Sequence, residues 1–173
     1  MTTDQIKQKI RHVPDFPKPG ILFYDITTLL QDAAGFHAAV DALAGPFQGK
    51  QIDVVVGIES RGFIFGAAVA DRIGAGLIPV RKPGKLPFTT ISASYALEYG
   101  TDALEMHHDG IVKGQRVLIV DDLLATGGTA RATLDLVTQL GGEVHALAFL
   151  IELVALKGRE RLPGANIHTV LQY

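Results

Sequence analysis

The sequence of 173 residues contains no cysteine and has no strong excess of charge of either sign. The absence of cysteine excludes disulfide bonds and thiolate metal sites, and it is compatible with a reducing cytoplasm. Because 16 Lys and Arg stand against 18 Asp and Glu, the net charge is -2. The overall field therefore gives no reason to expect nucleic acid or an anionic membrane as a partner. An anionic ligand must be held by a local group of donors.

Long hydrophobic runs are also missing. The longest uninterrupted one, residues 146–151, is far shorter than the roughly 20 residues that span a bilayer. Residues 1–13 alternate polar and charged side chains and lack the apolar region of a signal peptide. With 47% apolar residues the chain can still bury a sizeable core. These features predict a soluble, cytoplasmic protein.

From residue 33 onward, apolar runs typical of strands alternate with helical patterns. Buried strands that alternate with helices predict an α/β fold with a mostly parallel sheet flanked by helices. We expect one domain over residues 1–173, with residues 1–32 as an N-terminal arm and 33–173 as the core. The expected strands are 52–57, 77–81, 116–121, 144–151 and 167–171, and the expected helices are 63–73, 129–140, 155–162 and one that Asp32 caps.

Three stretches are less regular. Residues 3–12 indicate a short amphipathic helix, and the proline-rich stretch 14–20 can form neither a helix nor a central strand, so it predicts a fixed extended arm. Residues 82–93 predict a long mobile loop. The next residues predict a hairpin, with strands 94–99 and 103–107 around 100–102.

Ligands of parallel sheets bind beyond the carboxyl ends of the strands, which directs attention to the residues after Gly57, Arg81 and Asp121. At the last of these, four apolar residues are followed by Asp121 and Asp122. Burying a lone carboxylate costs several kcal/mol, so we expect both side chains at the rim of the cleft. Adjacent carboxylates suit a vicinal diol or a divalent cation.

The next five residues, Ala125, Thr126, Gly127, Gly128 and Thr129, open a helix. Small residues let backbone amides approach an anion, while the helix start and the threonine hydroxyls add favourable partial charges. The pattern predicts a phosphate-binding loop. A plain strand–turn–helix with glycine at the boundary is the alternative, but it explains neither the Asp pair nor both threonines.

Two further strand ends carry candidate anion donors. Residues 54–63 form a second strand–turn–helix, whose turn contains Glu59, Ser60 and Arg61. The third strand end opens a segment with three cations in five residues, among them Arg81 and Lys85. A solvated surface is the alternative for both, and the position at strand ends favours a ligand.

Residues 117–129 resemble the phosphoribosyl diphosphate signature of the type I phosphoribosyltransferases, and they do not match a Walker A motif. Asp-Asp followed by Ala-Thr-Gly-Gly-Thr is similar to the members of that family that use adenine. The same members resemble this chain in Gly-Ile-Glu-Ser-Arg-Gly-Phe at 57–63, Leu-Glu-Tyr-Gly at 97–100 and Leu-Lys-Gly-Arg-Glu at 156–160. The last motif is expected to be structural.

The resemblance implies roles for individual residues. Asp121 and Asp122 would bind the ribose hydroxyls, residues 125–129 the 5′-phosphate, and Glu59, Ser60 and Arg61 the diphosphate together with Arg81 and Lys85 from the mobile loop. Glu98 would lie near the base and Tyr99 would act in loop closure. The stretch 14–25 resembles the family's base-binding hood: Phe23 and Leu123 would contact the two faces of the base, and the backbone of Leu22 and Tyr24 its edge. Tyr24 departs from the family, where many members have Arg.

The implied reaction is transfer of the phosphoribosyl group from phosphoribosyl diphosphate to adenine, giving AMP and diphosphate. Mg²⁺ would be carried mainly by the substrate, near Asp121 and Asp122, with no direct protein cage. The resemblance also implies a homodimer. Two alternatives stay open: the same chemistry on hypoxanthine, guanine or xanthine, and a non-catalytic sensor of phosphoribosyl diphosphate.

Overall fold

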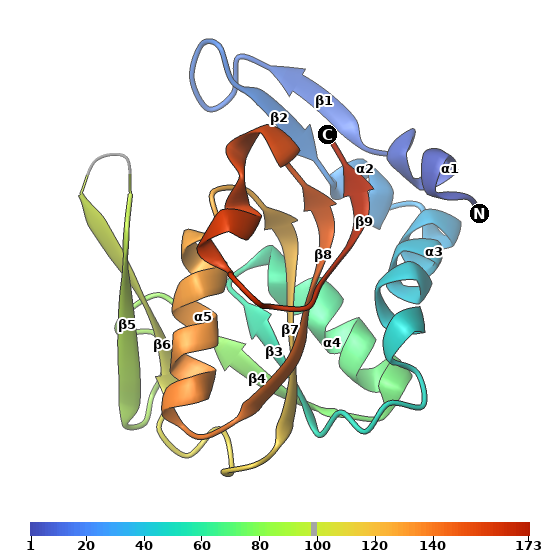
Figure 1. Cartoon of the computed structure of the whole chain (residues 1–173). Helices are drawn as coiled ribbons and strands as arrows, with labels where there is room; N and C mark the ends of the chain where they lie inside the picture. Colours follow the sequence, from blue (N-terminus) through green and yellow to red (C-terminus); the bar gives the residue numbers. More distant parts are fainter. Residues whose placement is uncertain (98–99) are drawn as a thin grey trace. The chain divides into compact units, whose positions relative to one another are not determined.

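The computed structural model describes residues 1–97 and 100–173 (Figure 1). The chain divides into two compact units. The first unit comprises Met1–Ala42 and the second Leu43–Tyr173. The first unit therefore extends past the expected arm of residues 1–32 and includes most of α3 (Ala33–Ala44). The expected function rests mainly on residues of the second unit.

The first unit contains a two-stranded antiparallel sheet that the sequence did not predict, and the proline-rich stretch 14–20 lies mostly between its two strands. Strand β1 (Arg11–Pro14) pairs with β2 (Leu22–Asp25), so the expected helix 3–12 is shortened to α1 (Thr3–Lys7). The prediction missed this because a strand pair depends on contacts between segments, which local periodicity does not record. A one-turn helix α2 (Thr27–Leu30) leads to α3, and the predicted cap is confirmed: the Asp32 carboxylate accepts the Gly35 amide at 2.6 Å.

The second unit is built on a parallel sheet, which confirms the predicted α/β fold. The strand order is β4-β3-β7-β8-β9, and each neighbouring pair is parallel. The strands run over Val54–Ile58 (β3), Gly76–Val80 (β4), Arg116–Leu124 (β7), Glu143–Glu152 (β8) and Ile167–Gln172 (β9).

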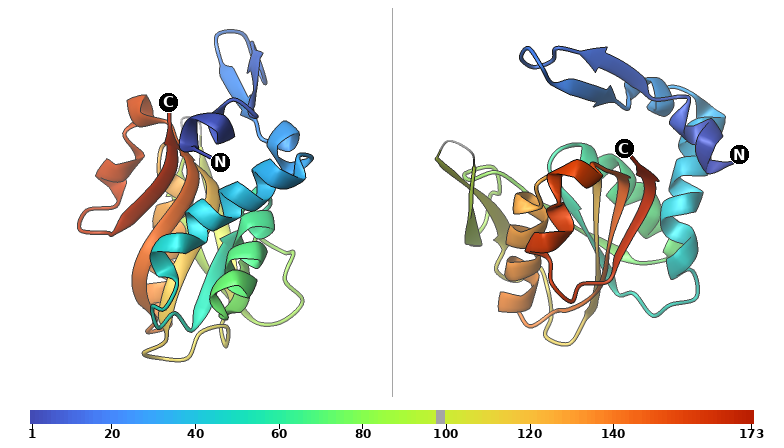
Figure 2. Two further views of the ribbon diagram at one scale, coloured as in Figure 1. Left: turned by 90° about the vertical axis from the view of Figure 1, so that its right-hand side faces the viewer. Right: turned by 45° about the horizontal axis from the view of Figure 1, so that its top comes forward.

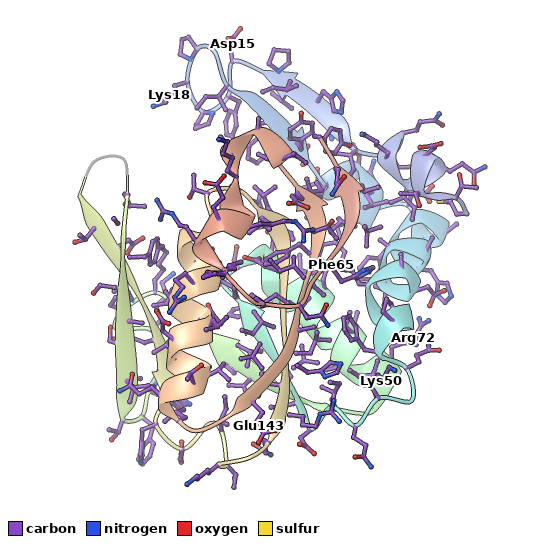
Figure 3. The ribbon with its side chains drawn as sticks, viewed as in Figure 1. Asp15, Lys18, Lys50, Phe65, Arg72 and Glu143 are labelled. Atoms are coloured by element: carbon purple, nitrogen blue, oxygen red, sulfur yellow. The ribbon has the colours of Figure 1, made fainter. Side chains whose placement is uncertain are left out.

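Helices cover both faces of this sheet, as Figures 1 and 2 show. Helix α5 (Gly128–Gln139) packs on one face through a core that includes Ile119, Leu136 and Phe149, all fully buried. Helix α4 (Arg61–Ile73) contacts β3, β4 and β7, and its Phe65 lies in the interior with no exposed surface (Figure 3). Burial on both faces explains why the strands are continuous apolar runs.

Strand β5 (Thr90–Ala96) pairs with β6 (Thr101–His107) in an antiparallel hairpin. Because β5 begins at Thr90, the expected mobile loop 82–93 is shorter than predicted. The expected helix 155–162 is instead two 3-10 turns, η2 (Val154–Leu156) and η3 (Gly158–Arg161), and a third, η1 (Gly45–Phe47), follows α3. Across residues 1–97 and 100–173, none of the helices has the length and apolar character that crossing a membrane requires.

Candidate phosphoribosyl-binding site

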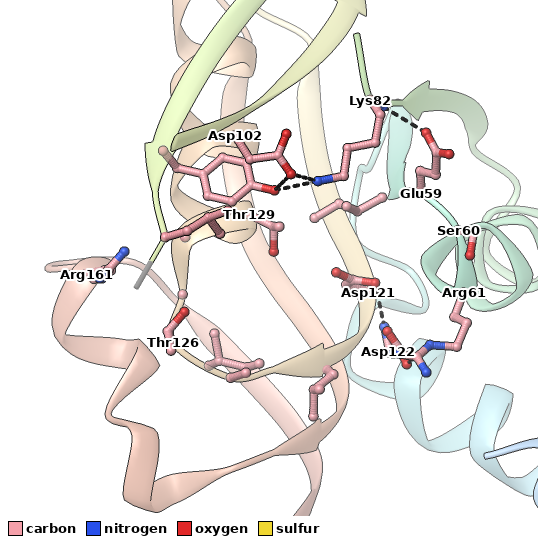
Figure 4. Close-up of a pocket in the computed structure, with 18 of the residues that line it drawn as sticks. Glu59, Ser60, Arg61, Lys82, Asp102, Asp121, Asp122, Thr126, Thr129 and Arg161 are labelled. Atoms are coloured by element: carbon pink, nitrogen blue, oxygen red, sulfur yellow. Dashed lines mark hydrogen bonds and ion pairs between the residues drawn. The ribbon is translucent and has the colours of Figure 1, made fainter. Parts of the chain in front are cut away.

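A pocket of about 870 Å³ lies at the carboxyl ends of β3 and β7 (Figure 4). The chain continues from β3 to β4 on one side, and from β7 to β8 and β9 on the other. Adjacent strands whose connections run in opposite directions form the crevice in which α/β sheets bind ligands. The lining residues are Ile58, Glu59, Ser60, Arg61, Lys82, Tyr95, Ala96, Leu97, Asp102, 121–129 and Arg161.

The two adjacent carboxylates line this pocket, but they are buried. Asp121 is 7% exposed and Asp122 is 6% exposed, because β7 continues to Leu124. Their place in the cleft agrees with the prediction, but the expectation that they stay at its rim and avoid burial was wrong. Arg61 compensates one charge, with its Nε 2.7 Å from an Asp122 carboxylate oxygen, and the Asp122 amide donates to Asp121 at 2.9 Å.

Burial controls the electrostatics of the pair. Burial, and then the neighbouring Asp122 charge, raises the pKa of Asp121 well above its ordinary value. Burial also raises the pKa of Asp122, although the Arg61 guanidinium opposes the shift. The pocket therefore holds two carboxylates that would gain from hydroxyl donors or a cation.

Gly62 lets the start of α4 approach the pair closely. A β carbon at this position would lie 2.6 Å from an Asp121 carboxylate oxygen and 3.1 Å from the Val120 carbonyl oxygen. Any larger residue would thus displace the carboxylate, which explains why glycine follows Arg61.

The loop between β7 and α5 carries the expected phosphate-binding residues. Gly127 has φ +85° and ψ 4° and precedes α5, which begins at Gly128. A β carbon on Gly127 would lie 2.5 Å from the Gly158 carbonyl oxygen, and one on Gly158 would lie 2.5 Å from the Ala125 carbonyl oxygen. The two backbones pack directly on each other, which is a physical reason for glycine in both motifs.

The motif around Gly158 is also tied to the sheet through Glu152. This carboxylate, 5% exposed, accepts hydrogen bonds from Arg159 Nε at 2.6 Å and Nη2 at 2.8 Å. Thr169 and Gln172 of β9 donate to it at 3.1 Å and 3.2 Å. The segment of residues 156–160 thus packs against the phosphate loop and fixes it to the sheet, in line with the structural role expected of it.

Replacing Glu152 by Gln is expected to lower the free energy of unfolding by about 1–2 kcal/mol at neutral pH, because charge-assisted hydrogen bonds are lost while Arg159 remains partly solvated. The Arg159 hydrogen bonds, more than any other contact, hold the pKa of Glu152 below its ordinary value. The stabilisation is therefore present above about pH 4.3, where Glu ionises in the unfolded chain, and is lost as the pH falls through the lower folded-state pKa. Urea denaturation of both proteins at several pH values measures this.

The matched control is Glu160→Gln in the same segment. The Glu160 side chain is 72% exposed, and the Lys157 Nζ atom, with which it pairs, is 3.9 Å away. We expect a change below about 0.5 kcal/mol. Equal effects of the two variants would contradict the role given to Glu152.

The turn after β3 places Glu59, Ser60 and Arg61 along the pocket wall. Glu59 is already occupied by protein groups: it accepts the Lys82 amide at 2.8 Å, pairs with the Lys85 ammonium and lies 3.5 Å from Arg81 Nε. Burial raises the pKa of Glu59, but these partners outweigh it and the net shift is downward. The geometry makes Glu59 an anchor for the segment after β4.

Arg81 and Lys85 are therefore directed at Glu59, and neither is among the residues that line the pocket. Their expected contact with the diphosphate stays a prediction. The cation from this segment that does line the pocket is Lys82.

The remaining predicted residues fall into two groups. Leu22, Phe23 and Tyr24 lie on β2, where Phe23 packs edge-on against Phe16 with ring centres 5.0 Å apart. Glu98 and Tyr99 lie outside the described residues.

Four polar pocket residues were not among the predicted site residues: Lys82, Tyr95, Asp102 and Arg161. Lys82 was part of the cationic run, but the sequence offered no reason to prefer it over Arg81 or Lys85. Tyr95 and Asp102 face each other across the β5–β6 pair, which only strand register reveals. Arg161 directly follows the motif at 156–160, far from the phosphate loop in the sequence, and nothing in that motif indicates a ligand contact.

Comparison with known proteins agrees with this geometry. Residues 25–165 match the model of the phosphoribosyl transferase domain. The chain thus belongs to the phosphoribosyltransferase family.

The relatives of this chain indicate which phosphoribosyltransferases it resembles. A protein of Acidobacterium capsulatum that is 60% identical over 98% of this chain and 94% of its own length is named adenine phosphoribosyltransferase. The crystal structure of adenine phosphoribosyltransferase from Thermoanaerobacter pseudethanolicus superposes with a TM-score of 0.96 at 52% identity, covering 99% of this chain and 100% of the other. The enzyme of that name from Saccharomyces cerevisiae, complexed with adenine and an imino-altritol bisphosphate, gives a TM-score of 0.92 at 41% identity, covering 98% of both chains.

Proposed function

We propose that this chain catalyses adenine phosphoribosyl transfer: adenine and 5-phosphoribosyl 1-diphosphate react to give AMP and diphosphate. The observation that carries the proposal is the order of groups along one pocket wall. The Asp pair is followed closely by the loop that begins helix α5. The carboxylates would bind a sugar diol, and the backbone amides of the loop would bind the 5′-phosphate of the same sugar.

In the proposed reaction adenine N9 forms a bond to the anomeric carbon of the ribose while the bond from that carbon to the diphosphate oxygen breaks. The proton of N9 is released, and the bonding electrons leave with the diphosphate. Positive charge develops on the sugar, and the buried carboxylates of Asp121 and Asp122 would orient the hydroxyls and tolerate that charge. Arg61, held by Asp122, would face the departing diphosphate.

The side of the pocket that carries Asp121 and Asp122 also suits a magnesium ion. Within residues 1–97 and 100–173, no three His, Asp or Glu side chains converge as a metal cage. Asp121 and Asp122 offer hard oxygen donors, which suits a cation that keeps several waters and substrate oxygens. When bound, Mg²⁺ would neutralise charge on the leaving diphosphate.

The base-binding assignment rests on family resemblance and on the character of the β1–β2 pair. Leu22 and Tyr24 both lie on strand β2, and the resemblance implies that their backbone groups read the edge of the base. The resemblance assigns Phe23 and Leu123 to the two faces of the base: an aromatic ring would stack on the base, and the half-buried Leu123 side chain would add an apolar contact. Because the two residues belong to different units, their joint contact with the base stays a prediction. The yeast relative was crystallised with adenine, which supports this choice of base. A cytoplasmic location and a homodimer stay predictions.

The deciding experiment incubates the purified protein with phosphoribosyl diphosphate and Mg²⁺ and with adenine, hypoxanthine, guanine or xanthine in turn. Product nucleotide and released diphosphate are quantified. We expect AMP from adenine, with the other bases slower by at least about 100-fold, because a polar edge left unpaired on binding is costly.

Two outcomes would contradict the proposal. Faster turnover of another purine would transfer the assignment to that base. Binding of phosphoribosyl diphosphate without release of diphosphate in the presence of any base would support a sensor instead.

A further inference from the structure

Lys82 is held in the pocket by two residues of the β5–β6 hairpin. Its ammonium group donates to the Tyr95 hydroxyl at 2.8 Å and forms an ion pair with the Asp102 carboxylate, and Tyr95 in turn donates to Asp102 at 3.1 Å. All three residues line the pocket, and Figure 4 labels Lys82 and Asp102. They form a closed triangle of polar groups.

The hairpin side of the triangle is firmly placed. Asp102 accepts the Ala103 amide at 2.8 Å with its second oxygen. The Tyr95 ring packs against the start of α5 so closely that a β carbon on Gly128 would lie 2.9 Å from it. Neither partner of Lys82 can therefore shift without disturbing its own anchor.

The backbone of Lys82 is anchored as well, because its amide donates to Glu59 at 2.8 Å. Lys82 thus belongs to the end of the pocket formed by residues 59–61. Figure 4 shows it at the opposite end from Thr126, which belongs to the expected 5′-phosphate loop. A ligand extended between these ends would present its second anionic group to Lys82.

An ammonium group has three donors, and the triangle uses two of them. For the third, the described part of the chain contains no further partner. Burial lowers the pKa of Lys82, but the hydrogen bonds to Asp102 and Tyr95 outweigh it and the net shift is upward, so the group stays charged. The side chains of Lys82 and Asp102 are 37% and 32% exposed, and an ion pair so exposed contributes little to stability.

We propose that Asp102 and Tyr95 are positioning residues that hold Lys82 with its free donor directed at the diphosphate group of the substrate. This inference rests on the proposed function, and it adds a residue, Lys82, that the motif assigned to Arg81 and Lys85 did not single out. The physical reason is preorganisation: a lysine whose rotamers are already restricted loses less entropy when it binds an anion.

The first test is direct binding, which needs no turnover. Inorganic diphosphate with Mg²⁺ and AMP are titrated separately by calorimetry into wild type and Lys82→Ala. We expect Lys82→Ala to weaken diphosphate binding about 10-fold or more, as for loss of a charge-assisted hydrogen bond, and AMP binding to change less than about 2-fold, because AMP carries no diphosphate. Equal weakening of both ligands, or of neither, would overturn the proposal.

The second test separates positioning from structural support. Asp102→Asn and Tyr95→Phe, which keeps the ring against Gly128, should each raise KM for phosphoribosyl diphosphate about 3- to 10-fold and leave KM for adenine unchanged. In the Lys82→Ala background, Asp102→Asn should have no further effect, since the two act through one group. Asp109→Asn, on an exposed residue just after β6, serves as the control and should match wild type.

The outcomes are distinguishable. A fall in KM for phosphoribosyl diphosphate in Asp102→Asn would mean that Asp102 competes with the substrate for Lys82, which contradicts positioning. Additive effects of Lys82→Ala and Asp102→Asn on KM in the double variant would also contradict positioning. Failure of wild type to form AMP would reject the proposed function, while the diphosphate titration would still report on Lys82.

Discussion

Replacing Gly127 by Ala is expected to raise KM for phosphoribosyl diphosphate about 100-fold or more and to destabilise the fold by several kcal/mol. Two costs add. The backbone has φ +85°, where a side chain costs about 1–2 kcal/mol. In addition, the new β carbon would meet the Gly158 carbonyl oxygen at 2.5 Å. Because that oxygen is backbone, the loop of residues 125–129 must move, and its amides lose their arrangement. Steady-state kinetics and thermal denaturation measure both effects.

Gly164→Ala is the matched control for this variant. Gly164 has φ +76°, and a β carbon there would meet nothing within 4 Å. We expect only the conformational cost, about 1 kcal/mol, and unchanged kinetics. If Gly127→Ala behaved like Gly164→Ala, close packing against Gly158 would not be what shapes the phosphate loop.

Replacing Asp121 by Asn is expected to reduce kcat/KM about 100- to 1000-fold while increasing thermal stability. The carboxylate is 7% exposed beside a second carboxylate, so removing its charge relieves an unfavourable burial. The same change removes an acceptor that the ribose and its developing charge would use. Each kcal/mol gained would raise Tm by roughly 2–4 °C for a chain of this size. Asp109→Asn, which removes an exposed charge, should change neither quantity.

The stability gain should depend on pH in a defined direction. Burial raises the pKa of Asp121 in the folded protein above its value in the unfolded chain, which is about 3.9. Below that value both states bind the proton and the variant gains nothing. As the pH rises from there, the unfolded chain releases the proton first, so the wild type loses stability relative to Asp121→Asn until the folded-state pKa is passed. A difference in the free energy of unfolding that stayed constant from pH 4 to 8 would contradict the raised pKa.

The order of strands and helices in the core could be predicted because each element carries its own pattern. Residues 117–120 are apolar without interruption, which is typical of a strand buried on both faces, and β7 covers them. The turn before α5 was predicted from its glycine and threonine residues. The backbone freedom of glycine and the hydroxyl group of threonine belong to the residue itself and do not depend on distant parts of the chain. Asp121 and Asp122 were assigned to the pocket for the same reason: carboxylates directly after a buried strand need partners.

The exposure of that pair could not be predicted, because it depends on atoms from elsewhere in the chain. Arg61 reaches Asp122 only because β3 and β7 are neighbours, and Gly62 lets α4 pack onto Asp121. The prediction used the cost of burying a single unpaired carboxylate, and that cost takes no account of Arg61 or of the close packing at Gly62. The hairpin of β1 and β2 was missed for a related reason, since strand pairing is a property of two segments.

The sequence alone therefore determined the α/β class, the positions of the strand ends and the chemical character of the two segments that face the ligand, since each depends on residues adjacent in the chain. Only the tertiary structure decided which strand ends meet. It placed Lys82 in the pocket and directed Arg81 and Lys85 to Glu59, and it brought Tyr95 and Asp102 to Lys82. The physical reason is that a cation's role depends on the nearest anion in space, and that neighbour is set by strand order and register.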